Sequence, residues 1–121
     1  MIGIDLVKID RVTAMIERHG EKALRRFLDA EEISLLRRPE TAAGFWAAKE
    51  ACAKALGCGI GAECGFHDIV LSKSGKGAPR LALSETVRAR FGVTAASVSI
   101  THDGGFAIAV VALEKADIKT T

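Results

Sequence analysis

The stretch FWAAKEACAKALG, residues 45–57, constrains the fold of this chain more than any other part of it. Small and apolar residues lie on almost every side of the helix that it predicts, so little polar surface is left to face water. Such a helix has to be surrounded by other elements. It nevertheless carries Lys49, Glu50 and Lys54, and ionised groups on a largely buried helix need partners or a ligand.

Elements that can surround this helix are predicted before it. The apolar run MIGIDLVKI predicts a strand with Ile2, Ile4 and Leu6 on one face. Helical spacing follows over residues 10–20, with Asp10 as the expected N-cap, and one or two short helices are expected over residues 21–38. The central helix is then expected to begin near Thr41 and to end in the Gly-rich residues 57–65.

The C-terminal half predicts strands at residues 68–74 and 79–84, a short helix over 84–92 with Ser84 as N-cap, and a hairpin of strands 96–102 and 106–115. The expected order is therefore β-α-α-α-β-β-α-β-β. We predict an α+β fold with a mainly antiparallel sheet covered on one side by helices. With 121 residues, the chain is expected to form a single domain over residues 1–121.

Composition favours a cytoplasmic protein. The formal net charge is only +2 and aromatic residues make up 5% of the chain, so nothing indicates a nucleic-acid partner. Cys52, Cys58 and Cys64 lack the spacing of a zinc site, and no signal-peptide pattern precedes them, which predicts free thiols. No apolar run approaches the roughly 18 residues that a membrane span requires, so we expect no membrane partner.

Two carboxylates and a lysine are the first candidates for chemistry. Glu50 and Lys54 are four residues apart, which on spacing alone describes a solvated ion pair. Asp5 lies within an apolar strand, where backbone N–H groups can hold it. Together, however, Asp5 and Glu50 on two elements beside a lysine are what Mg²⁺ shared with substrate phosphates requires. No comparable reason emerges for Lys49 beyond a phosphate or carboxylate partner.

Three further groups of residues are ambiguous on their own. The strand SVSITHD presents hydroxyls that either bind phosphate or form the outward side of a sheet, and its His102 suits a phosphate donor, a general base or a structural histidine. The loop KSGKGAP offers Lys73 and Lys76 to an anion. The arginines Arg11, Arg18, Arg25 and Arg26 form either a patch for an acidic partner or a solvated face.

The segments GIDLVKIDRV, FWAAKEACAKALGCGI and VSITHD, in this order and at these distances, resemble the holo-acyl-carrier-protein synthase family of 4′-phosphopantetheinyl transferases. The resemblance covers nearly the whole chain. It implies the phosphopantetheinyl transferase fold and transfer of the 4′-phosphopantetheine arm of coenzyme A to a serine of apo-acyl carrier protein. Release of adenosine 3′,5′-bisphosphate, support of fatty acid biosynthesis, and a homotrimer with sites between subunits are implied as well.

The resemblance also assigns roles to residues. It implies that Asp5 and Glu50 bind Mg²⁺ and that Lys54 lies close to the pyrophosphate. Coenzyme contacts are implied for Lys54, Gly57, Lys76, Thr101 and His102, and carrier-protein contacts for Arg11, Arg18, Arg25 and Arg26. In two places the chain departs from the family pattern, with Cys58 where a threonine is common and Gly75-Lys76-Gly77-Ala78-Pro79 where Gly-Lys-Pro is common, so the place of Lys76 is open.

The mechanism implied is in-line attack of the carrier serine on the β-phosphorus of coenzyme A. Glu50, directly or through a metal-bound water, is our candidate for the base, and Lys54 would stabilise the leaving bisphosphate. A small basic nucleic-acid-binding module is the first alternative, but it leaves Asp5 and Glu50 without a purpose. A non-catalytic oligomeric relative is the second, and the intact set of Asp5, Glu50 and Lys54 argues against it.

Overall fold

Helix α4, Pro39–Leu56, is the central element of the computed structural model, which describes residues 1–116. It begins two residues before the predicted start because proline suits the first position of a helix. It ends, as predicted, at the Gly-rich segment, where Gly57 adopts a left-handed conformation with a φ of 84°. Most of its residues are buried, including Lys49.

Helix α4 packs on one face of a three-stranded antiparallel sheet. The strand order is β1-β5-β4, from β1 (Ile2–Lys8), β5 (Phe106–Lys115) and β4 (Val93–Asp103). The turn between β4 and β5 contains Gly104 and Gly105, both with positive φ, at the predicted hairpin. A separate antiparallel pair is formed by β2 (Ile69–Lys73) and β3 (Pro79–Leu83).

Close packing of α4 on β1 depends on Gly3. A Cβ atom at this position would lie 1.9 Å from the carbonyl oxygen of Ala51, so any side chain would push the helix away from the strand. At the other end of the helix, Gly44 approaches the Ile100 side chain of β4. Helix α4 therefore crosses the sheet, from β4 near its start to β1 near its end.

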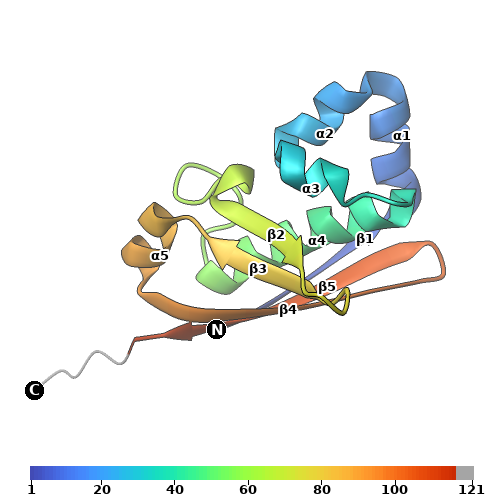
Figure 1. Cartoon of the computed structure of the whole chain (residues 1–121). Coiled ribbons are helices and arrows are strands. Elements are labelled where there is room, and N and C mark those ends of the chain that lie inside the picture. Colours follow the sequence, from blue (N-terminus) through green and yellow to red (C-terminus); the bar gives the residue numbers. More distant parts are fainter. Residues whose placement is uncertain (117–121) are drawn as a thin grey trace, which may run out of the picture.

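The predicted alternation of β1 is confirmed. Gly3 and Val7 face α4 and are buried, whereas Ile2, Ile4 and Leu6 are 75%, 58% and 56% exposed. Figure 1 shows the helices and the β2–β3 pair on one side of the sheet and none of the described elements beneath it. The α+β class and the one-sided covering of the sheet are as predicted.

The remaining helices correct two details of the prediction. They are α1 (Ile9–His19), α2 (Glu21–Phe27), α3 (Ala30–Ser34), α5 (Glu85–Phe91) and a 3₁₀ turn, η1 (Phe66–Asp68). Of the one or two short helices expected over residues 21–38, two are present, so four α-helices rather than three precede β2. Strand β1 runs directly into α1, so the N-cap is Lys8 and Asp10 lies in the first turn.

The buried side chains form one hydrophobic cluster that links β1, α4, the hairpin of β4 and β5, and the β2–β3 pair. Ser84 caps α5 as predicted, accepting a hydrogen bond from the backbone N–H of Val87. Within residues 1–116, no helix combines the length and apolar character needed to cross a bilayer.

Candidate active site

Asp5 and Lys54 meet where β1 passes under the end of α4. The Lys54 ammonium donates to Asp5 Oδ1 at 2.8 Å and to the carbonyl oxygen of Ile4 at 3.2 Å. The Asp5 side chain is only 14% exposed, whereas that of Lys54 is 53% exposed. A largely covered carboxylate is thus held by a cation that remains open to solvent.

Glu50 lies one helical turn before Lys54 and completes this group, which we call the carboxylate set (Asp5, Glu50 and Lys54). Burial, and next the Asp5 carboxylate, raise the pKa of Glu50 above its usual value, while Lys54 and Arg11 act in the opposite direction. Crowding of two carboxylates favours binding of a cation, because a divalent ion relieves their repulsion.

The donor set is small. Among residues 1–116, no three His, Cys, Asp or Glu side chains are arranged to hold a metal ion. Two carboxylates on different elements fit Mg²⁺, which commonly takes one or two protein carboxylates and completes its shell with water and substrate phosphates.

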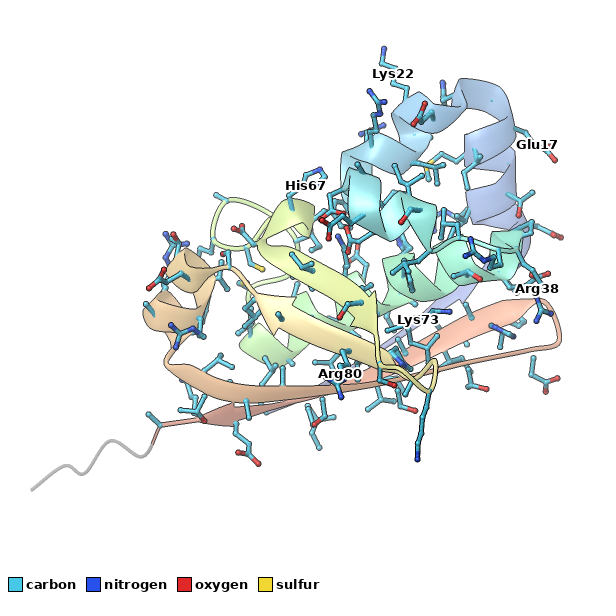
Figure 2. The ribbon with its side chains drawn as sticks, viewed as in Figure 1. Glu17, Lys22, Arg38, His67, Lys73 and Arg80 are labelled. Atoms are coloured by element: carbon cyan, nitrogen blue, oxygen red, sulfur yellow. The ribbon has the colours of Figure 1, made fainter. Side chains whose placement is uncertain are left out.

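A cavity of about 180 Å³, the α4–β4 cavity, opens beside the start of α4. His102 and Lys73 contribute positive or hydrogen-bonding groups, and Phe45 and Pro79 supply apolar walls. Figure 2 shows Lys73 on the β2–β3 pair, close to the beginning of α4. Glu40 also lines the cavity, and its buried Oε2 finds no hydrogen-bond partner in the described part of the chain.

Helix α4 separates the carboxylate set from the α4–β4 cavity. At about 100° per residue, the stripe of Trp46, Glu50 and Lys54 lies on the opposite side of the helix from Gly44 and Phe45. The sheet adds to the separation, because Lys54 pairs with Asp5 on β1 whereas His102 belongs to β4, two strands away. A single chain therefore does not bring His102 to Asp5 and Glu50.

The other predicted coenzyme residues lie in different surroundings. Thr101 is exposed on the opposite sheet face from His102, as expected for neighbours in a strand. Lys76 is exposed in the β2–β3 turn, and Lys73 rather than Lys76 lines the α4–β4 cavity. Gly57 is the C-cap of α4. Coenzyme roles for Thr101, Lys76 and Gly57 stay predictions.

All four candidate docking arginines are exposed, Arg11 and Arg18 on α1 and Arg25 and Arg26 on α2. Arg26 lines a hollow of about 260 Å³ together with Met15, Trp46 and Phe66. Since Trp46 is one turn before Glu50, this hollow lies next to the carboxylate set. A hollow with one arginine at its edge and an apolar floor thus lies about one helical turn from Glu50.

Lys49, for which the sequence suggested only a phosphate or carboxylate partner, pairs with a carboxylate. Its ammonium is fully buried and donates to Glu32 Oε1 at 2.9 Å. Burial lowers the pKa of Lys49, and its hydrogen bond to Glu32 counteracts this. Glu32 was not predicted, although the spacing of Asp29 and Glu32 is that of a capping box, which the structure contains.

The three cysteines are free, as predicted. Burial raises the pKa of Cys52 to about 12 and that of Cys64 to about 11. Neither thiol is therefore ionised near neutral pH, and neither provides a nucleophile.

Comparison with known proteins decides the family. Residues 1–111 match the family model of the 4′-phosphopantetheinyl transferase superfamily. The chain belongs to the 4′-phosphopantetheinyl transferase superfamily. The resemblance noted in the sequence is thereby confirmed. Relatives within the superfamily include the holo-[acyl-carrier-protein] synthase of Wolinella succinogenes, 65% identical over 115 residues that cover 95% of this chain and 98% of the relative.

Solved structures of phosphopantetheinyl transferases agree with the fold. The holo-[acyl-carrier-protein] synthase of Helicobacter pylori in complex with coenzyme A has a TM-score of 0.92 and 49% identity, covering 94% of this chain and 100% of that one. The enzyme of Bacillus anthracis in complex with coenzyme A (3′,5′-ADP) has a TM-score of 0.80 and 35% identity, covering 95% and 96%. Both similarities extend over nearly the whole phosphopantetheinyl transferase chain.

Proposed function

We infer that this chain is a holo-[acyl-carrier-protein] synthase. It transfers the 4′-phosphopantetheine group of coenzyme A to a serine of apo-acyl carrier protein, giving holo-acyl carrier protein and adenosine 3′,5′-bisphosphate. The observation that carries this function is the Asp5–Lys54 contact at 2.8 Å beside Glu50, in a chain 65% identical to a holo-[acyl-carrier-protein] synthase. A nucleic-acid-binding module would have no use for these two half-buried carboxylates.

Mg²⁺ is the proposed cofactor, held by Asp5 and Glu50. The support is the preference of Mg²⁺ for oxygen ligands, together with burial and the neighbouring Asp5 carboxylate, which raise the pKa of Glu50. The bound ion would neutralise negative charge on the pyrophosphate oxygens.

The residues of the chain have separate tasks in the transfer. The carrier serine oxygen forms a bond to the β-phosphorus as the bond from that phosphorus to the bridging oxygen breaks, and adenosine 3′,5′-bisphosphate leaves with the electron pair. Lys54 is half exposed and offers its ammonium to the charge on the leaving group. Glu50 accepts the serine proton directly or through a water.

The complete site is proposed to lie between subunits of a homotrimer. The separation of the carboxylate set from His102 by helix α4 supports this, because a neighbouring copy can supply the missing part. The uncovered sheet face gives further support. Exposed Ile2, Ile4, Leu6 and Val110 form an apolar surface there, of a kind that commonly marks a protein interface.

The acidic helix of the carrier protein is proposed to dock on Arg11, Arg18, Arg25 and Arg26. Their exposure and the position of Arg26 at the hollow beside Trp46 support the docking. We propose a cytoplasmic location and a role in fatty acid biosynthesis, where coenzyme A and a carrier protein are both available.

The function is tested by incubating the protein with coenzyme A, Mg²⁺ and an apo-acyl carrier protein from the same organism. Mass spectrometry should reveal the added phosphopantetheine on the carrier serine, and chelation of Mg²⁺ by EDTA should abolish the addition. A carrier with its serine changed to alanine is the matched control. No modification at any ratio of enzyme to carrier would rule the function out.

A further inference from the structure

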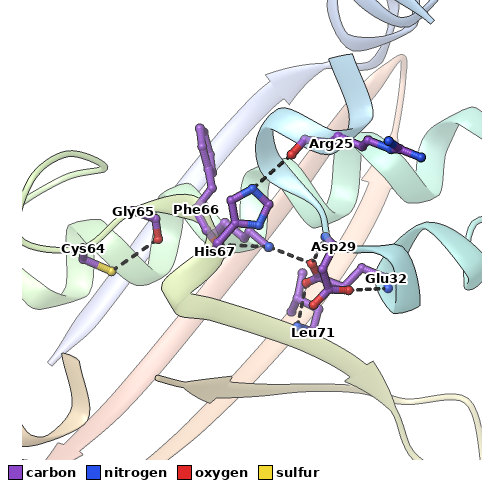
Figure 3. Close-up of polar contacts among 9 residues, drawn as sticks. Arg25, Asp29, Glu32, Cys64, Gly65, Phe66, His67 and Leu71 are labelled. Atoms are coloured by element: carbon purple, nitrogen blue, oxygen red, sulfur yellow. Dashed lines mark hydrogen bonds and ion pairs between the residues drawn. The ribbon is translucent and has the colours of Figure 1, made fainter. Parts of the chain in front are cut away.

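A chain of polar contacts joins the docking helix α2 to the catalytic helix α4 through residues that the reaction does not use (Figure 3). It begins at Lys49, which precedes the catalytic Glu50. The Lys49 ammonium donates to Glu32 Oε1 of α3 at 2.9 Å and to the carbonyl oxygen of Phe66 at 3.1 Å. Lys49 thus ties α4 to both α3 and the turn η1.

Glu32 holds α3, α4 and β2 together. Its Oε1 also accepts the backbone N–H of Asp29 at 2.8 Å, and its Oε2 accepts the backbone N–H of Leu71 in β2 at 2.8 Å. Both carboxylate oxygens are therefore fully engaged while only 1% of the residue is exposed. A buried network of hydrogen bonds such as this one holds its elements in one arrangement.

His67 extends the network to α2. It follows Phe66 directly, and its Nε2 lies 3.0 Å from the carbonyl oxygen of Arg25. Because a carbonyl oxygen can only accept, Nε2 carries the hydrogen of this bond. Arg25 is in the last turn of α2, where carbonyl oxygens lack partners within the helix.

The side chains that α2 presents are otherwise loosely held. Arg25 is 71% exposed and has one ion pair, to Glu21 at 3.3 Å, and such exposed pairs contribute little. The fully buried Phe27 anchors the end of α2, packing on Trp46 and Phe66. Phe27 holds the end of α2 against the core, and the hydrogen bond from His67 orients the last turn of α2.

We propose that His67 is a positioning residue for carrier recognition. Its bond to Arg25 holds the last turn of α2 so that Arg25 and Arg26 face the carrier at a fixed place relative to Glu50. The inference rests on the proposed docking of the carrier on these arginines. It assigns no contact between His67 and either substrate, so His67 acts only through α2.

The test compares steady-state kinetics of the full chain and of its His67→Ala and His67→Gln variants, with apo-acyl carrier protein and coenzyme A varied separately. Loss of one hydrogen bond predicts a rise of about three- to tenfold in the KM for the carrier in His67→Ala. The KM for coenzyme A and kcat should stay within about twofold. His67→Gln keeps a donor at similar reach and should restore most of the affinity.

A double-mutant cycle separates positioning from general weakening of the fold. Changing Arg25 and Arg26 to alanine leaves the Arg25 carbonyl in place, so the His67 bond persists while the side chains that it positions are gone. In that background, His67→Ala should change the KM for the carrier by less than about 1.5-fold. His19→Ala on α1 is the matched control and should change nothing.

Three results with the His67→Ala change would overturn the proposal. These are an unchanged KM for the carrier in His67→Ala, an equal rise in the KM for coenzyme A, and a full effect in the Arg25→Ala/Arg26→Ala background. If Arg25→Ala/Arg26→Ala itself leaves the KM for the carrier unchanged, the docking face is wrong and the role of His67 falls with it. Thermal unfolding of each variant identifies any loss of folded protein.

Discussion

At the scale of single residues, the ionised form of Glu50 lowers the stability of the fold, although the proposed reaction requires it. Burial and the nearby Asp5 raise its pKa above the ordinary 4.5. The stability that protonated Glu50 contributes is present below pH 4.5 and is lost as the pH rises through the raised value. Near pH 7, without Mg²⁺, the ionised Glu50 therefore opposes folding, although it is the group that we propose as the base.

Glu50→Gln separates the two effects. We expect kcat to fall about 10²- to 10⁴-fold, because the amide cannot accept the serine proton. In EDTA at pH 7, Tm should be unchanged or higher, because a half-buried negative charge beside Asp5 has been removed. Glu63→Gln, in an exposed loop, is the control for both measurements. Full activity in Glu50→Gln would eliminate Glu50 from the mechanism, and a large drop in Tm would attribute the lost activity to unfolding.

At the scale of elements, the buried pair of Lys49 and Glu32 holds α4 against α3 and β2. Lys49→Met leaves the Glu32 carboxylate buried without its counter-ion, which should cost about 3–5 kcal/mol in the free energy of unfolding. Adding Glu32→Gln should recover part of the loss, since the neutral amide oxygen still accepts the Leu71 N–H.

Urea denaturation measures this pair, with Lys22→Met on the exposed surface of α2 as control (Figure 2). The midpoint for Lys49→Met should be far below that of the parent, and the double variant should lie between them. A single variant as stable as the parent would contradict the structural role of the pair. A double variant less stable than the single one would contradict the attribution of the cost to a buried charge.

Features set by neighbouring residues could be predicted from the sequence, whereas contacts between residues distant in the sequence could not. Alternation in β1 identified the inward face of Asp5, and Gly57 marked the end of α4, because both signals lie within a few neighbouring residues. The need for Gly3 arises from a helix backbone nearly fifty positions away. No local pattern pairs Lys49 with Glu32 either, since 17 residues and a helix boundary separate them.

The structure brings together only some of the residues predicted for the site. Asp5, Glu50 and Lys54 were expected together and are together. His102 was expected near the same phosphates, yet α4 lies between it and the carboxylate set within one chain. The sequence predicts which face of a strand a residue lies on. It does not predict on which side of α4 that residue lies, because this depends on how the helix crosses the sheet.

At the scale of the whole molecule, the separation of His102 from Glu50 within one chain predicts complementation between inactive chains. If Glu50 of one chain and His102 of a neighbour form one site, Glu50→Gln and His102→Ala chains should each be nearly inactive alone. In a cyclic oligomer of the two mixed equally, about one site in four receives both intact residues, because each intact residue is present with a probability of about one half.

Co-expression of the two differently tagged chains, followed by purification through both tags, isolates mixed oligomers for this measurement. Activity of about a quarter of the parent or more is expected, since selection removes the unmixed oligomers, and Mg²⁺-dependent phosphopantetheine transfer provides the assay. Mixing the purified variants without subunit exchange is the control and should give only the sum of their separate activities. Co-expressed oligomers that also give only this sum would place the complete site within one chain, despite the helix between its parts.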